Sequence, residues 1–391
     1  MVLKPLSEVA DVVRGIAFPK EDKSDVQRPG DVACLRTTNV QKQVEWDDLW
    51  FVPAKHVRRD DQNVRTGDIL ISTANSFELV GKVAQVAGLP TPATLGAFIS
   101  LIRPKDGVHP KFLYYQLAWG RTQTRIREMS SNTTNISNVS TKKLATLELA
   151  VPDLDEQTLI VAELEKQFSR LDEAVANLQR VKANLRRYQK SAIESLTNPD
   201  TFDHCVSGTI ADIAISLDNL RKPVNKAERA TRPGNVPYLG ANGQTGWIDR
   251  HLFDEEIVLV VEDETFVGRS APFSYHFAEK CWVNNHTHVL RAKSDLVLPK
   301  YLNLALSYYP FIPLTTGSTG RRKLTKGALM AAPIQVPTLA RQRGVVAEVD
   351  RRLSLVRRVS EEVDANLKRA QSLRQATLRK SFNTDYFGSA Q

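Results

Sequence analysis

The chain has 391 residues, of which 42% are hydrophobic and 25% charged, so two or three domains with a sizeable core are expected and disorder is not. The net charge of +9 favours a polyanionic partner, because Lys and Arg neutralise phosphates. Cys34, Cys205 and Cys281 form no CxxC pair, which excludes a disulfide framework and fits a reducing cytoplasm, and no long apolar run indicates a signal peptide or a membrane span.

Residues 1–151 are predicted to form a mixed domain of short strands with one or two helices. Asp68–Ser72 has the pattern of a buried strand, residues 81–86 that of its neighbour, and Pro110–Trp119 that of a short helix with Pro in its first turn. The polar loop Ser130–Asn135 follows. Hydroxyl and amide side chains contact phosphates and base edges, although such a loop can also be merely solvent-exposed. The candidate DNA-binding residues here are Thr133, Thr134 and Asn135.

A long helix is predicted from about Asp155 to Leu196, where the sequence has neither Pro nor Gly. Asp153 and Asp155 are suited to cap its start, and Asn198-Pro199 ends it. Apolar residues recur at alternating steps of three and four, as in a coiled-coil seam. They are Leu164, Phe168, Leu171, Val175, Leu178, Val181, Leu185 and Tyr188.

Residues 198–336 are predicted to form a second mixed domain. Residues 256–261 read as a strand and Pro299–Tyr308 as a short helix. The Gly-rich segment Leu239–Trp247 lacks the Gly-Lys-Ser/Thr ending of a phosphate-binding loop, so we expect tight turns between strands. The candidate DNA-binding residues are Asn242 and Gln244 in this segment, and Ser318, Thr319, Arg321, Arg322 and Lys323 in a polar loop that follows the second short helix.

The segment Cys281–His288 is the richest in potential metal ligands. His286 and His288 form a His-x-His pair that would share one face of a strand. The pair lacks acidic or Cys partners at the spacing of a zinc site, so packing within a strand or contact with DNA is favoured and no metal is expected.

A second long helix is predicted at the end of the chain, with the same spacing of apolar positions. Its seam residues are Val349, Leu353, Val356, Ser360, Val363, Leu367, Ala370 and Leu373. The helix is strongly basic. A solvated charged face explains this, and contact with DNA or a partner subunit is the alternative.

The chain is two copies of one unit. Val151–Gln157 returns as Val336–Gln342 at an offset of 185 residues, and that register continues along both helices. Two copies indicate pseudo-twofold symmetry, which would pair the helices antiparallel. Each helix would be roughly 60 Å long, and the pair would hold the mixed domains apart at a fixed distance. The alternative is two amphipathic helices docked on separate domains. We therefore predict an α+β protein with domains at 1–151, 152–197, 198–336 and 337–391.

Motifs of catalysis are not found in the sequence. It has no GxxxxGK[ST], no Asn/Asp-Pro-Pro-Tyr/Phe quartet of an amino-methyltransferase, and no nuclease carboxylate pair, since Glu262-Asp263-Glu264 lacks the following Lys. No catalytic residue is therefore predicted.

The repeated order of these elements resembles the specificity subunit of type I restriction–modification systems over essentially the full length. The resemblance rests on the two helix starts, the helix ends Tyr188–Ile193 and Leu373–Leu378, and Trp282–Leu290. The family usually has Pro-Pro-Leu at the helix start, where this chain has Asp153 and Thr338 in place of the second Pro, and Arg341 replaces an expected Glu.

The resemblance implies two target recognition domains that each read one half of a split double-stranded DNA sequence. The paired helices would act as a ruler and a dock for modification subunits, and restriction/motor subunits would join them in the cytoplasm. S-adenosylmethionine, ATP and Mg²⁺ are then expected on the partners and no cofactor in this chain. Two alternatives stay open, namely the recognition part of another methylation-based phage-defence system and a coiled-coil scaffold with two ligand-binding domains.

Overall fold

The computed structural model describes residues 2–132, 136–264, 266–317 and 322–382. The chain divides into two compact units, with residues 1–177 and 366–391 in unit 1 and residues 178–365 in unit 2. Each unit therefore combines one mixed segment with one half of each long helix, and each is described by itself. Among the described residues, no helix is long and apolar enough to cross a membrane.

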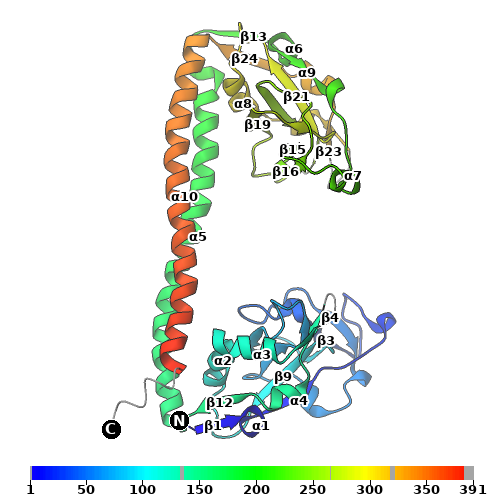
Figure 1. Ribbon diagram of the computed structural model, residues 1–391, viewed down its shortest axis with the longest axis vertical. Helices are drawn as coiled ribbons and strands as arrows, with labels where there is room; N and C mark the ends of the chain where they lie inside the picture. Colours follow the sequence, from blue (N-terminus) through cyan, green and yellow to red (C-terminus); the bar gives the residue numbers. More distant parts are fainter. Residues whose placement is uncertain (1, 133–135, 265, 318–321, 383–391) are drawn as a thin grey trace. The chain divides into compact units, whose positions relative to one another are not determined.

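Unit 1 contains an antiparallel sheet in the order β2-β9-β5-β7 (Figure 1). Every residue of β5 is buried, because the sheet is covered on both faces. The strands of this sheet are β2 (Ala10–Arg14), β9 (Ile99–Pro104), β5 (Ile69–Ser72) and β7 (Val83–Gln85). Beside it lie the sheet of β4 (Trp50–Pro53), β3 (Asp31–Leu35) and β8 (Ala93–Leu95), and the pair of β1 (Val2–Pro5) and β12 (Glu148–Val151).

The third sheet of unit 1, which we name ribbon 1, consists of β10 (Ser131–Asn132), β11 (Ser137–Asn138) and β6 (Ala74–Asn75). The short helices of the unit are α1 (Leu6–Val9), α2 (Pro110–Ala118), α3 (Gly120–Glu128) and α4 (Thr141–Ala145), with 3-10 turns at Lys20–Asp22, Thr37–Asn39, Ala54–His56 and Asp60–Gln62. Helix α2 lies between the sheet and the long helices in Figure 1, and its Phe112 and Leu113 are fully buried.

Unit 2 repeats this topology strand for strand. Its antiparallel sheet runs β14 (Ala214–Ser216), β21 (Thr287–Ala292), β17 (Ile257–Val261) and β19 (Ser274–Phe277). The neighbouring sheet is β16 (Gly243–Ile248), β15 (Val236–Gly240) and β20 (Trp282–Val283), and the pair is β13 (Cys205–Thr209) with β24 (Pro333–Pro337). Ribbon 2 consists of β22 (Thr315–Thr316), β23 (Arg322–Leu324) and β18 (Asp263–Glu264).

The short helices of unit 2 are α6 (Ile210–Ile213), α7 (Lys226–Ala230), α8 (Pro299–Ser307) and α9 (Lys326–Ala331), with 3-10 turns at Pro199–Thr201, Asp218–Leu220 and Ile312–Leu314. Helix α8 occupies the place that α2 has in unit 1. Its Tyr301 and Leu302 join Val258 and Leu290 of the sheet in one buried cluster. The predicted strands at residues 68–72, 81–86 and 256–261 and both short helices are confirmed, with ends that differ by one to two residues.

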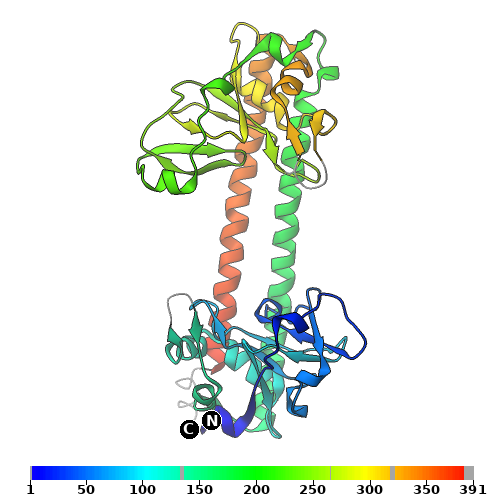
Figure 2. The ribbon, with the colours of Figure 1, turned by 90° about the vertical axis from the view of Figure 1, so that its right-hand side faces the viewer.

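The two long helices are α5 (Leu154–Thr197) and α10 (Leu339–Phe382), and Figure 2 shows them side by side. In unit 1, α5 and α10 are antiparallel: Gln167 lies against Thr377, and further along α5 Asp172 lies against Arg374. In unit 2, Lys182 pairs with Asp364, and Ile193 packs in one cluster with Val345 and Val349. The predicted antiparallel pairing is thus present within each unit.

The residues of each long helix that face the other helix recur at steps of four and three in strict alternation. Three residues of the predicted apolar stripe do not fit this spacing and point outward instead. Val181, Tyr188 and Leu373 are 40%, 47% and 57% exposed. The inward positions beside them are filled by polar residues, which a search for apolar side chains passes over. They are Lys182, Gln189 and Arg374, each partly buried. A 3.5-residue period decides which side chains face the partner helix, whatever their polarity.

The repeated Gln of the helix starts joins each long helix to its mixed segment. Gln157 and Gln342 are 1% and 0% exposed. The Gln157 side chain accepts from the His109 amide at 2.8 Å and donates to the carbonyls of Gly107 and Pro152. Gln342 makes the equivalent bonds, accepting from the Leu298 amide at 2.8 Å and donating to two carbonyls, those of Leu296 and Pro337. Buried amides need such partners, so the Gln fixes the direction in which each helix leaves its unit.

Candidate nucleic-acid interface

The polar loops singled out in the sequence lie on the two ribbons. In unit 1, β10 and β11 pair antiparallel on either side of residues 133–136. In unit 2, β22 and β23 pair on either side of residues 317–321. The two polar segments thus connect equivalent strands of the two ribbons. Six predicted contact residues lie outside the described residues: Thr133, Thr134, Asn135, Ser318, Thr319 and Arg321.

The side chains of the two basic candidates on β23, Arg322 and Lys323, differ in how they are held by neighbouring groups. The Arg322 guanidinium donates to the hydroxyl of Thr315 at 2.7 Å and to its carbonyl at 3.0 Å, so it stabilises the ribbon. The Lys323 side chain is 57% exposed, with its Nζ 3.3 Å from a carboxylate oxygen of Glu262. Of the two side chains, that of Lys323 is therefore the more accessible from solvent.

Asn242 and Gln244 lie on the hairpin between β15 and β16, on the turn that the Gly-rich segment predicted. Gly243 has a φ of +99°, a conformation that favours glycine. The Asn242 side chain accepts from Arg269 at 2.9 Å, and Gln244 donates to the Gly246 carbonyl at 3.2 Å; both side chains are exposed. Trp247 on the same hairpin is 55% exposed and was not singled out in the sequence.

A three-residue linker lies between the hairpin and ribbon 2. It comprises residues 284–286 and connects β20 to β21. The Asn284 amide donates to the Leu239 carbonyl of β15 at 3.0 Å, and the Glu262 amide donates to the His286 carbonyl at 3.1 Å. The linker thus ties the element that carries Asn242 and Gln244 to the ribbon that carries Lys323.

Beneath ribbon 2 lies a buried network of charged groups. The His288 ring is 1% exposed, with Nδ1 2.6 Å from a carboxylate oxygen of Asp218 and Nε2 2.8 Å from the Leu324 carbonyl. Arg221 contacts the carboxylates of both Asp218 and Glu262. Burial raises the pKa of Asp218, but hydrogen bonds from His288 and the Val289 amide and the charges of His288 and Arg221 outweigh it, so the pKa lies below its ordinary value.

This network corrects the interpretation of the His-x-His pair. Strand β21 begins at Thr287, so His286 lies in the linker with an exposed side chain, whereas His288 is buried. Ligand atoms of Asp218, Glu262 and His288 lie within 4.8 Å of one another, a grouping found among the described residues. Arg221 bridges the two carboxylates, so the group fits an ion-pair network. Sequence spacing did not reveal it because Asp218 and His288 are 70 residues apart.

Ten of the predicted seam residues lie on the facing sides of α5 and α10. Leu164, Phe168, Val349, Val356 and Val363 are buried. The remainder are partly buried: Leu171, Leu178, Leu185, Leu353 and Leu367.

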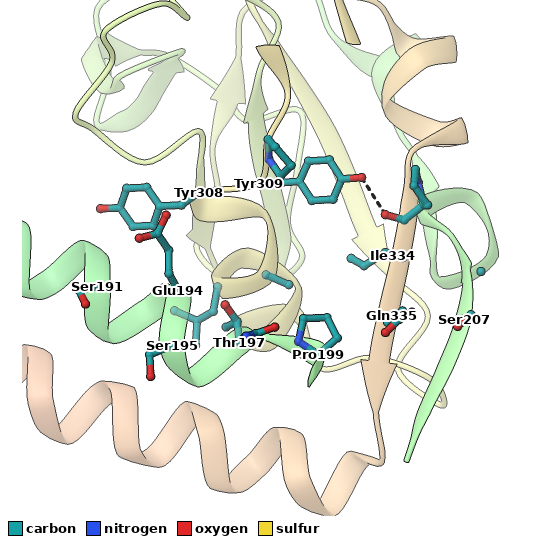
Figure 3. Close-up of a pocket in the computed structure, with 16 residues that line it drawn as sticks. Ser191, Glu194, Ser195, Thr197, Pro199, Ser207, Tyr308, Tyr309, Ile334 and Gln335 are labelled. Atoms are coloured by element: carbon teal, nitrogen blue, oxygen red, sulfur yellow. Dashed lines mark hydrogen bonds between the residues drawn. The ribbon is translucent and has the colours of Figure 1, made fainter. Parts of the chain in front are cut away.

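A cleft of unit 2 lies where the last turns of α5 approach α8 and β24 (Figure 3). It has a volume of about 730 Å³. In Figure 3 the Tyr309 hydroxyl donates to the Pro333 carbonyl, at 2.8 Å. A cleft of about 320 Å³ has the equivalent place in unit 1, where Phe382 packs against Trp119. Hydroxyl and apolar groups line the larger cleft, with Glu194 as its acidic residue.

Cys34 and Cys281 are placed in the core, whereas Cys205 is partly exposed. Burial raises the pKa of Cys34 and of Cys281 to about 12. A thiol reacts as its thiolate, so these two groups are unreactive near neutral pH.

Comparison with known proteins matches this architecture. The family model for the type I restriction modification DNA specificity domain matches residues 1–183 and 203–351. The StySPI specificity subunit of Salmonella potsdam is 23% identical over 97% of this chain and 87% of its own length. The putative MjaX specificity subunit of Methanocaldococcus jannaschii is 23% identical over 95% of this chain and 92% of its own length.

A solved structure from a type I R-M system has the same fold, with a TM-score of 0.70, 16% sequence identity and coverage of 98% of both chains. The family model covers well over half of the chain, in two stretches that fall on the two repeats. The chain belongs to the family of type I restriction–modification DNA specificity subunits.

Proposed function

We propose that this chain reads a split double-stranded DNA target, with one half-site per unit, and carries the modification subunits that methylate it. The observation that carries the proposal is the repeat itself. In both units a polar segment connects equivalent strands of a ribbon, β10 to β11 in unit 1 and β22 to β23 in unit 2. A pseudo-twofold reader fits a target with two halves, as dimeric DNA-binding proteins fit two half-sites.

The chain contributes positioning and base contacts to the reaction, and the chemistry belongs to its partners. Exposed Lys323 is placed for a phosphate, while the exposed amides of Asn242 and Gln244 match base edges. S-adenosylmethionine would be bound by the modification subunits, and ATP and Mg²⁺ by the restriction/motor subunits. The complex would work in the cytoplasm, where bacterial DNA lies.

The outer faces of the long helices support docking of one modification subunit per unit. Tyr188 in unit 2 and Leu373 in unit 1 are equivalent positions at the 185-residue offset. Both are large and apolar, and they are 47% and 57% exposed. Their recurrence at matched places is what two copies of one partner, each bound to one unit in the same way, would require.

The experiment combines the chain with the modification subunit encoded beside it, in a host without DNA methylation. Modified adenines are mapped by long-read sequencing, and a motif of two parts with a fixed spacer is expected. Exchanging residues 1–151 for those of another family member should change one part and leave the other. A motif that stays unchanged in both parts, or a single continuous motif, contradicts the proposal.

Docking is tested separately by native mass spectrometry of the complex. Tyr188→Ala and Leu373→Ala should each reduce the modification subunits bound per chain from two to one. Val181→Ala, at an exposed position of α5 without a large apolar equivalent in α10, serves as the control and should leave two. Full binding by both variants would exclude these positions as docking contacts.

A further inference from the structure

An exposed ring occupies the same place in both units. Phe98 is the last residue of the three-residue linker 96–98 between β8 and β9, and His286 is the last residue of the linker between β20 and β21. Phe98 is 65% exposed and the His286 side chain 47%. The residue after each ring, Ile99 or Thr287, is fully buried. The two linkers therefore turn one ring outward from equivalent positions in the repeat.

The backbone of each linker is held at both ends by the same hydrogen bonds. At its start, the Gly96 amide donates to the Leu35 carbonyl at 2.9 Å, as Asn284 does to Leu239. At its end, the Phe98 carbonyl accepts from the amides of Thr73 and Ala74 at 2.9 and 3.1 Å. The His286 carbonyl accepts from Glu262 at the matching place. An exposed side chain on a fixed backbone meets a ligand with little loss of conformational entropy.

Each linker also adjoins the elements that carry the polar contact candidates. Ala74, which donates to Phe98, is the first residue of β6 in ribbon 1. Glu262, which donates to His286, directly precedes β18 of ribbon 2, and Glu262 also pairs with Lys323. The rings thus lie beside the ribbons whose loops are expected to contact DNA.

The two rings differ in chemistry although their scaffolds agree. Phe98 offers an apolar surface. His286 offers ring nitrogens, with Nδ1 3.5 Å from Asp263, so that Nε2 is the ring atom placed to bind a further group. Two units that recognise different base pairs need different side chains at the same backbone position, and Phe98 and His286 meet this requirement.

We propose that Phe98 and His286 each contact one base pair of the half-site that their unit reads, Phe98 through the 5-methyl group of thymine and His286 through a hydrogen bond to a base edge. This proposal rests on the proposed function. Aromatic and other apolar side chains contact the thymine methyl group in the major groove, and acceptor atoms of purines lie in the same groove.

The test uses the complex of the full chain with its modification subunit and the methylation map described above. The Phe98→Ala variant should relax the motif at one position of one half-site, with discrimination at that base pair reduced about ten-fold. His286→Ala should do the same in the other half-site. Val26→Ala and His251→Ala are matched controls at exposed positions of units 1 and 2, and both should leave the motif unchanged.

Exchange of the rings separates base reading from a structural role. Phe98→His and His286→Phe should each alter the preferred base at one position while the other half-site keeps its sequence. If the wild-type complex gives a split motif and all four variants keep it, or lose methylation equally at every site, the assignment of these rings is wrong. If the wild-type complex gives no split motif, the proposed function fails instead. Phe98→Leu, which keeps an apolar side chain, should preserve thymine at its position and shows whether a loss in Phe98→Ala is a folding defect.

Discussion

Units 1 and 2 agree in their scaffold and differ beneath their ribbons. Both have the same sheet orders, and both hold a long helix by a buried Gln that bonds to three main-chain groups. Unit 2 supports its ribbon on Asp218, Arg221, Glu262 and His288, whereas unit 1 has Ser100 at the position of His288. The scaffold that the two units share thus rests on main-chain bonds and the apolar pattern, and the side chains beneath the ribbon differ between the units.

The largest effect is expected from a change in the charged network beneath ribbon 2, in which the two units differ. Asp218→Asn should destabilise unit 2 by about 3 kcal/mol, because it removes a buried carboxylate that contacts both the His288 ring and the Arg221 guanidinium. Hydrogen–deuterium exchange of the full chain should show faster exchange in β17 and β21, with unit 1 unchanged. Ser100→Ala is the control at the matched position of unit 1, where the buried hydroxyl has no hydrogen-bond partner in the described structure, and it should change little. Equal loosening of both units by Asp218→Asn would contradict a network local to unit 2.

The same carboxylate gives the network a pH dependence. The pKa of Asp218 is lower in the folded chain than its ordinary value of 3.8, so its contribution is complete above about pH 4 and is lost as the pH falls through the folded value. Acid should therefore open unit 2 more in the wild type than in Asp218→Asn, relative to each protein at neutral pH. An identical acid response of the two proteins would show that Asp218 carries no such stabilisation.

The next largest effect is expected at the two Gln junctions, in which the two units agree. Gln157→Met and Gln342→Met should each cost about 2–3 kcal/mol, since both remove hydrogen bonds to buried main-chain groups at nearly constant side-chain volume. Exchange should increase at the first turn of α2 in one variant and of α8 in the other. If only one unit responds, the two junctions are not equivalent despite their geometry.

A smaller loss of stability is expected when the N-terminal caps of the two long helices are removed, and it should differ between them. Asp153 accepts from the Glu156 amide at 2.9 Å, and Thr338 accepts from the Arg341 amide at 3.4 Å. Asp153→Ala should cost about 1 kcal/mol, and Thr338→Ala less, because its bond is longer and its oxygen is uncharged. Thermal denaturation of the two variants gives the order, and an equal or reversed order would refute this account.

The smallest effect concerns the polar pairs in the helix seam. A double-mutant cycle on Lys182 and Asp364 should give about 0.5 kcal/mol, because both side chains are partly exposed. High salt should reduce that coupling. A large coupling energy that salt does not change would contradict this expectation. It would mean that another bound chain shields the Lys182–Asp364 pair from solvent.

The sequence predicted the principal strands, the long helices and the repeat because each has a regular pattern. The periods are two residues for strands, 3.5 residues for the paired helices and 185 residues for the repeat. Sequence reasoning misplaced Tyr188 and Leu373 because it followed apolar residues, and the true seam continues through Gln189 and Arg374. It treated His286 and His288 alike, although one lies just outside β21. The partners of His288 come from distant segments, and no local spacing marks them.

Comparison of the two repeats pairs Phe98 with His286 in the sequence, but the two residues differ in chemistry, so the pairing alone gives no sign of a shared role. Their common backbone bonds and the exposure of both rings are seen only in the structure, and they are the observations on which the proposed shared role rests. The candidate contacts on the ribbon loops remain predictions, since most of them lie outside the described residues.

Gln157 and Gln342 form their junctions with main-chain atoms alone, and main-chain atoms are the same in every sequence. A different mixed segment would therefore keep the bonds of its junction wherever its backbone follows the same path, whatever side chains it carries at those points. Elsewhere the mixed segments contact the helices through side chains, as Lys111 does with Glu165 and Trp119 with Phe382. Exchange of a whole mixed segment would thus have to preserve the packing against the helices, whereas the junction itself would form with any sequence.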